Sequence, residues 1–153
     1  MISEFKNLNE EESSLMLMAP ALVTLLIAGA EGTVDQKETD WATKITHMRA
    51  GNSTILQDYF QEVDQNFTDM LHELIIAMPE STDERAEKIN LELSKLNGIL
   101  PKLNKDFAVE FYKSLLSLSK QVAQASGGVF GYGSISPEEK KFLDLDAINS
   151  PEE

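Results

Sequence analysis

The sequence contains no cysteine and only 13 basic side chains among 153 residues. The absence of cysteine excludes disulfide bonds, zinc–thiolate sites, iron–sulfur clusters and thiol catalysis, and it is compatible with a reducing compartment. Because 26 acidic side chains bring the net charge to −13, nucleic acid is not an expected partner. The charge balance favours cations or a basic protein surface instead, while acidity that serves solubility alone is the simpler alternative.

A long hydrophobic run is also missing. The longest apolar stretch, Leu15–Ala30, is interrupted by Pro20 and Gly29 and flanked by acidic residues. It is shorter than the roughly 18 to 20 residues of a membrane span and lacks basic anchors, so we predict a buried core helix and no direct membrane insertion. The first dozen residues lack the basic start and apolar stretch of a secretory signal. We therefore expect a cytoplasmic protein.

Glycine and proline fall mostly between apolar-periodic segments, and no segment alternates as a strand would. The sequence predicts an all-α fold, a single compact domain over residues 1–153 with roughly seven helices and with flexible ends at 1–12 and 149–153. The first predicted helix runs from Ser13 or Ser14 to Gly29, and Pro20 either starts a new helix there or kinks one long helix. The second runs from Gln36 to Arg49, and two short helices are expected within 54–78. The remaining helices are predicted from Ser81 to about Gly98, from Asn104 to Ala125 and from Pro137 to Ile148.

Spacings of three and four residues identify the apolar side chains that are expected to form the core. In the second helix, Trp41, Ile45 and Met48 form one such stripe. Further inward-facing positions are Ile55, Phe60, Val63, Phe67, Leu71, Leu74, Ile75, Met78, Ala86, Ile89, Leu93, Leu96, Leu100, Phe107, Phe111, Leu115, Leu118 and Val122.

One turn design occurs at both ends of the chain. The segment Ala30–Glu38 matches Ala125–Glu139 once a glycine-rich insertion is allowed in the second copy. In each copy a glycine turn precedes a β-branched residue, a helix-capping residue and, three places later, a glutamate, which together form a hydrophobic staple and a capping box. The matched sets are Val34, Asp35 and Glu38 in the first copy and Ile135, Ser136 and Glu139 in the second. This repeat predicts pseudo-symmetric helix pairs at the two ends.

The paired motifs "LIAGAEGTVDQKE" and "ASGGVFGYGSISPEEK" resemble the TerB-like family of bacterial tellurite-resistance proteins. The resemblance extends from about Leu15 to Ile148. It implies a compact all-helical fold, a role in tellurite resistance or another stress response, protein partners that are basic or membrane-associated, clustered acids suggested to bind metal, and no enzymatic activity. The sequence departs from the family at Glu31, where aspartate is frequent, and at Ser126, the equivalent position of the second copy.

The first turn also resembles the second half of an EF-hand calcium loop. Glu31, Asp35 and Glu38 fall at ligand positions, but the first two carboxylate positions are occupied by Ile27 and Gly29. A tight EF-hand site is therefore not expected. A looser divalent-cation site that uses Glu31, Asp35 and Glu38, with Asp40 as a weaker candidate, stays open beside the alternative that these residues only cap a helix.

A second candidate surface is the aromatic pair Phe130 and Tyr132 in the glycine-rich segment before the last helix, which either anchors a partner or folds back onto the core. The two histidines, His47 and His72, lack the partners of a metal enzyme, and no nucleotide loop or serine nucleophile motif is present. The sequence thus predicts a non-enzymatic acidic module. It binds a divalent cation through the first turn or, alternatively, binds proteins alone through its acidic surface or aromatic pair.

Overall fold

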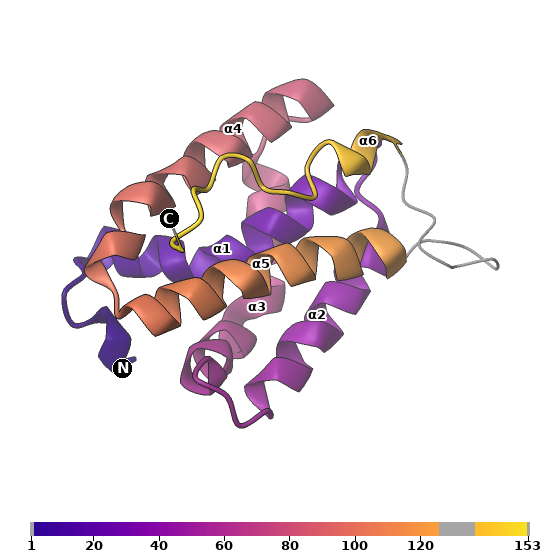
Figure 1. Ribbon diagram of the computed structural model, residues 1–153. Helices are drawn as coiled ribbons and strands as arrows, with labels where there is room; N and C mark the ends of the chain where they lie inside the picture. Colours follow the sequence, from indigo (N-terminus) through magenta and orange to yellow (C-terminus); the bar gives the residue numbers. More distant parts are fainter. Residues whose placement is uncertain (1, 126–136, 153) are drawn as a thin grey trace.

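The computed structural model describes residues 2–125 and 137–152, and every regular element within them is helical (Figure 1). The all-α prediction is therefore confirmed for this part of the chain. The α-helices are α1 (Glu10–Ala28), α2 (Gln36–Ala50), α3 (Gln57–Ala77), α4 (Thr82–Ser94), α5 (Lys105–Ala125) and α6 (Pro137–Lys140). Short 3-10 turns lie at Ser3–Phe5 (η1), Lys95–Gly98 (η2) and Leu100–Lys102 (η3).

Helix α1 is the centre of the fold. It contacts α2, α3, α4 and α5, and nearly all its side chains from Leu15 to Ala28 are buried (Figure 1). A helix that is apolar on all sides needs this position, which explains why the apolar run shows no polar face. Among the described residues, α1 is the one helix that is long and apolar enough to cross a membrane. Of its most apolar stretch of 18 residues, 67% is buried inside the fold.

The proline in α1 does not break the helix. Because Pro20 has no N–H, the Met16 carbonyl one turn earlier has no helical donor. The Tyr59 hydroxyl from α3 donates to this carbonyl at 2.5 Å instead. The helix also begins earlier than predicted, since Asn9 rather than Ser13 or Ser14 caps it and forms a closed capping box with Glu12. Of the two alternatives predicted at Pro20, the start of a second helix is therefore wrong, because one long helix runs through this residue.

Tyr59 is the centre of an aromatic cluster that joins α3, α5 and the N-terminal turn. Its ring lies edge-on to four phenylalanine rings at centroid distances of 5.0 to 6.3 Å, namely Phe5, Phe60, Phe107 and Phe111. Burial raises the pKa of the Tyr59 phenol well above its ordinary value. The N-terminal segment belongs to this core through Phe5 and Ile2, which are both buried.

Three further predictions about the helices are wrong, one on their number and two on where they end. Within residues 54–78 there is one helix, α3 (Gln57–Ala77), instead of two, because no residue in this segment forces a break. After α4 ends at Ser94, the chain continues in 3-10 turns rather than in α-helix as far as Gly98. The last helix ends at Lys140 instead of Ile148.

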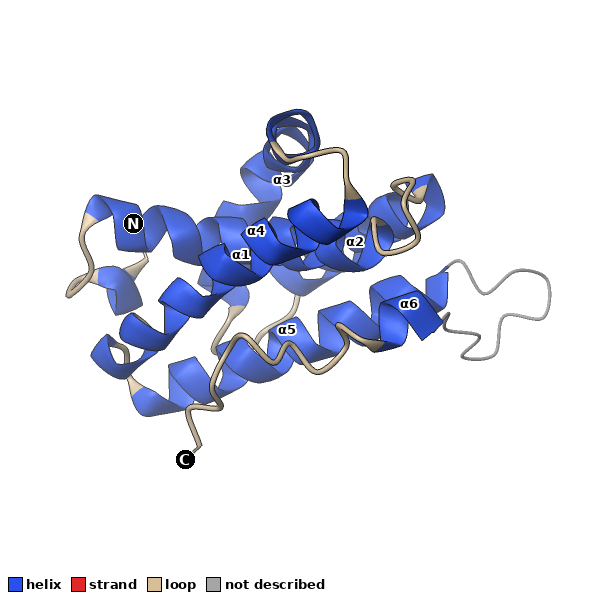
Figure 2. Cartoon of the chain, turned by 90° about the horizontal axis from the view of Figure 1, so that it is seen from above, coloured by secondary structure: helices blue, strands red, loops and turns tan. Residues whose placement is uncertain are grey.

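The segment after α6 follows an irregular path along α5 to the C-terminus (Figure 2). Side chains of the helices hold its backbone. The Asn97 side chain donates to the Ala147 carbonyl at 2.9 Å and accepts from the Asn149 N–H at 2.7 Å, while the Ser119 hydroxyl donates to the Leu143 carbonyl at 2.9 Å. These polar side chains replace the hydrogen bonds that a continued helix would have made.

Candidate functional site

The turn between α1 and α2, which carries the proposed cation ligands, is held by a buried arginine. The Arg85 guanidinium from α4 donates to the carbonyls of Gly29 at 2.6 Å, Gly32 at 3.1 Å and Glu80 at 3.3 Å. A Cβ atom on Gly29 would lie 2.7 Å from Arg85 Nη2, and Gly32 has a φ of +108°, a conformation that favours glycine. Gly32 is therefore favoured by the backbone geometry of the turn, while at Gly29 the absence of a side chain leaves room for the guanidinium.

Arg85 was missed by the sequence reasoning, which placed it on the capped helix without a role. The sequence feature that could have indicated its role is that Arg85 is the one Lys or Arg between Arg49 and Lys88. Such an arginine, placed beside a glycine turn in the fold, meets carbonyl groups that no helix satisfies.

Asp35 caps α2, as the repeat predicts. Its Oδ1 accepts from the backbone N–H groups of Lys37 at 2.9 Å and Glu38 at 3.2 Å. The capping box is not closed in return, because the Asp35 N–H donates to the Ala28 carbonyl at 2.9 Å. One oxygen of the proposed cation ligand is thus already engaged by two amides.

The other three candidate ligands face different surroundings. Glu31 is exposed, Glu38 is only 1% exposed, and Asp40 is exposed and accepts from the Gln36 side chain at 2.8 Å. Within residues 2–125 and 137–152, no group of three His, Cys, Asp or Glu side chains lies in an arrangement that could hold a metal ion. The cation site stays a prediction.

Glu139, the counterpart of Glu38 in the repeat, is also buried, with 2% of its surface exposed. Both glutamates lie in the first turn of their helices, α2 and α6. Phe130, Tyr132 and the predicted capping residue Ser136 lie outside the described residues. The aromatic-pair prediction is therefore untested.

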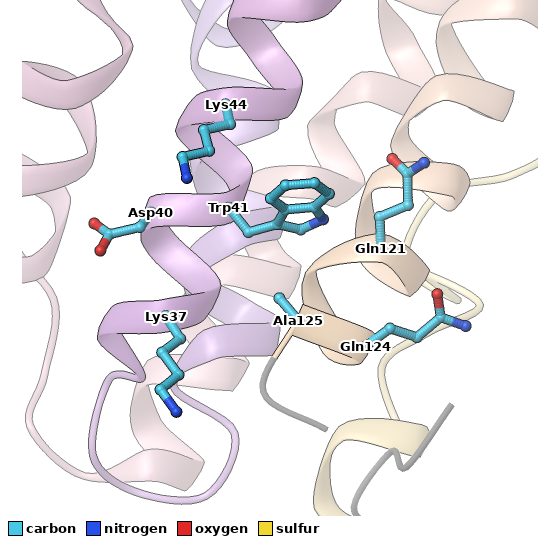
Figure 3. Close-up of a pocket in the computed structure, with 7 residues that line it drawn as sticks. All are labelled: Lys37, Asp40, Trp41, Lys44, Gln121, Gln124 and Ala125. Carbon is cyan, nitrogen blue, oxygen red and sulfur yellow. The ribbon is translucent and has the colours of Figure 1, made fainter. Parts of the chain in front are cut away.

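A groove between α2 and α5 has a volume of about 670 Å³ (Figure 3). The indole of Trp41 projects from α2 toward α5, where Gln121 faces it, and 39% of its surface is exposed. The lining residues are Lys37, Asp40, Trp41, Lys44, Gln121, Gln124 and Ala125.

The prediction that Trp41 and Met48 face the core is wrong, since Met48 is 52% exposed. The buried face of α2 consists instead of Glu38, Thr39, Ala42, Ile45 and Thr46. Only Ile45 of the predicted stripe belongs to it. Small and polar side chains fill this face because α2 packs closely against α3 and α5, so the apolar residues of α2 indicate the wrong side of the helix. Ile55 and Ile75 of the next segment are likewise exposed.

Arg49 contacts Gln121, one of the residues that line the groove. Its guanidinium lies 5.2 Å from the centre of the Phe60 ring and donates to the Ser114 carbonyl at 3.0 Å and to Gln121 Oε1 at 3.4 Å. Burial lowers the pKa of this guanidinium from its ordinary value, although arginine stays protonated at neutral pH. Since arginine only donates, the Gln121 oxygen faces Arg49 and the amide NH₂ is left to donate elsewhere.

Within the described part of the chain, neither Lys37 nor Lys44 forms an ion pair. The ion pairs there are Lys95–Glu92, Lys102–Glu12, Lys113–Glu152 and His47–Asp64. The rim of the groove therefore combines an accessible indole with two ammonium groups that form no ion pair with a described residue. No family model matches this chain, and neither a curated protein nor a solved structure shows significant similarity to it.

Proposed function

We propose that this chain is a non-enzymatic helical module that binds a partner protein through the groove between α2 and α5. The observation that carries the proposal is the exposure of Trp41 in this groove. Every other aromatic side chain in residues 2–125 and 137–152 is buried or half-buried. Tryptophan in a concave, partly apolar site is the side chain most enriched at the energetic centres of protein interfaces.

The wider setting rests on the resemblance to TerB-like proteins. On that basis we propose a single TerB-like domain with pseudo-symmetric ends, about seven helices and a cytoplasmic role in tellurite resistance or another stress response. Burial of both Glu38 and Glu139 at the start of their helices supports the proposed symmetry.

Divalent-cation binding at the α1–α2 turn is the second function that we propose. Glu31 is exposed and Asp35 is half-exposed, so these two carboxylates are the ones that solvent ions reach. The geometry favours partner binding, because Asp35 already caps α2 and Glu38 is buried.

The test of partner binding compares capture from an extract of the host cell by wild type, Trp41→Ala and Leu91→Ala. Leu91 is a matched control, since it is an exposed apolar residue on a different helix, α4. We expect Trp41→Ala to lose proteins that the wild type and the Leu91 variant both retain. Identical capture by all three would contradict the proposal.

A further inference from the structure

We propose that the partner presents an acidic amphipathic helix, which lies along one exposed stripe of α2. This stripe, here called the α2 stripe, consists of Lys37, Trp41, Lys44 and Met48. The inference rests on the proposed function, because it specifies which chemistry the Trp41 surface recognises.

The spacing of the α2 stripe is that of a helix-docking seam. Its members follow one another by four, three and four positions, so they line a single face of α2. All four side chains are exposed, whereas Thr39, Ala42 and Thr46 on the opposite side are buried in the fold. Two large apolar side chains at such a spacing on a solvent-facing surface are what a second helix would cover.

The polar groups around Trp41 are mostly hydrogen-bond donors. The donors are the Trp41 indole N–H, the two lysine ammonium groups and the NH₂ of Gln121, whose side-chain oxygen accepts from Arg49. The Gln124 amide adds both a donor and an acceptor. The one carboxylate of the groove, Asp40, accepts from Gln36 and points away from Trp41 in Figure 3. A surface of donors and positive charge selects a ligand rich in carboxylates.

The positions of the charges then select a helix. Lys37 and Lys44 are seven residues apart, which places them about 10 Å apart along the axis of α2. Two carboxylates seven residues apart on a partner helix have the same separation. The residues three and four places after the first carboxylate lie between the two carboxylates, opposite Trp41. An apolar residue there completes the match. Flanking charges of opposite sign set partner choice in the same way in coiled coils.

The net charge of −13 does not oppose this docking at physiological salt. Charges on other faces are screened beyond about 8 Å, and at the contact itself the two lysines outnumber the one carboxylate, Asp40. A short acidic helix is thereby accepted, while a long polyanion meets the acidic remainder of the surface.

The experiment uses two designed helical peptides of about 18 residues, long enough to hold helical structure. One carries glutamates seven residues apart with leucines between them on the same face, and the other carries lysines in place of the glutamates. Binding of each labelled peptide to the full chain is measured by fluorescence anisotropy. The variants are Lys37→Glu with Lys44→Glu and, as a control with the same spacing, Lys88→Glu with Lys95→Glu.

We expect the acidic peptide to bind the wild type and the control alike, and to bind the Lys37/Lys44 variant about 10-fold more weakly. The basic peptide should show the reverse preference. Equal binding of both peptides to the wild type, or binding of neither at millimolar concentration, would overturn the inference. If Trp41→Ala still abolishes capture in that case, the proposed function stands without it. If capture is also insensitive to Trp41, both are wrong.

Discussion

Arg85 and Gly29 should be energetically coupled, because the glycine leaves the space that the guanidinium occupies. Arg85→Ala removes hydrogen bonds to three carbonyls and leaves the most buried of them, Gly29 O, with the Gly32 N–H at 3.1 Å as its remaining donor. Hydrogen bonds from a charged group contribute about 1.5 to 3 kcal/mol each, but water replaces the partners nearer the surface. We therefore expect Arg85→Ala to lower the free energy of unfolding by about 3 kcal/mol.

Gly29→Ala places a Cβ atom 2.7 Å from Arg85 Nη2 and 2.9 Å from the Leu25 carbonyl, so one of these groups has to move. Overpacking of this kind costs about 1 to 3 kcal/mol. In the Arg85→Ala background the contact with the guanidinium is gone, and the same substitution should cost at least about 1 kcal/mol less.

Urea denaturation of the four proteins of this cycle, followed by circular dichroism, measures the coupling. Lys88→Ala is the control, since Lys88 is exposed on the same helix and its removal should change stability by less than about 0.5 kcal/mol. If Gly29→Ala costs the same in both backgrounds, or if Arg85→Ala matches the control, the guanidinium does not hold the turn.

Three further predictions concern the cap, the titration of a surface carboxylate and the cation. Asp35→Ala should lower stability by about 1 kcal/mol in urea melts, whereas Asp35→Asn, which still accepts from the amides, should cost much less; equal losses would exclude capping. The hydrogen bond from Lys102 and, second, the one from the Asn9 N–H lower the pKa of Glu12 in the folded chain. The stability that ionised Glu12 contributes is therefore fully present above the pKa of the unfolded chain, about 4.3, and is lost as the pH falls below that value. Lys102→Met should raise the pKa of Glu12 in an NMR titration, and an unchanged value would contradict the pair. Calorimetry with calcium, magnesium, manganese and zinc should give heat that Glu31→Gln diminishes if the turn binds a cation; no heat at millimolar metal removes that hypothesis.

The contrast between α5 and α2 shows what the sequence allowed us to predict. The core face of α5 follows from the spacing of Phe107, Phe111, Leu115, Leu118 and Val122, and all five side chains are buried as predicted. These residues are large, so their periodicity matches the surface that the helix buries.

In α2 the same reasoning chose the wrong face. Its close neighbours leave room for alanine and threonine, while Trp41 and Met48 remain outside. Periodicity cannot distinguish an apolar side chain that packs in the core from one that lies on the surface where a partner could bind. Only the positions of α3 and α5 determine which face of α2 is buried.

The sequence predicted the cap of the α1–α2 turn but not the arginine that holds its carbonyl groups. Asp35 caps α2 as the motif indicates, yet the arginine that holds the turn comes from α4, more than fifty residues along the chain. A contact of this length depends on how α1 and α4 pack, which local sequence patterns do not contain.

Trp41 is the only tryptophan of the chain, so its fluorescence reports directly on the surface that the account assigns to partner binding. The decisive measurement is acrylamide quenching of Trp41 in the free chain and in the presence of a protein captured in a Trp41-dependent manner. The account predicts ready quenching in the free chain, as expected for an indole that is 39% exposed, and strong protection with a blue-shifted emission in the complex. Unchanged quenching and emission in the complex would contradict it.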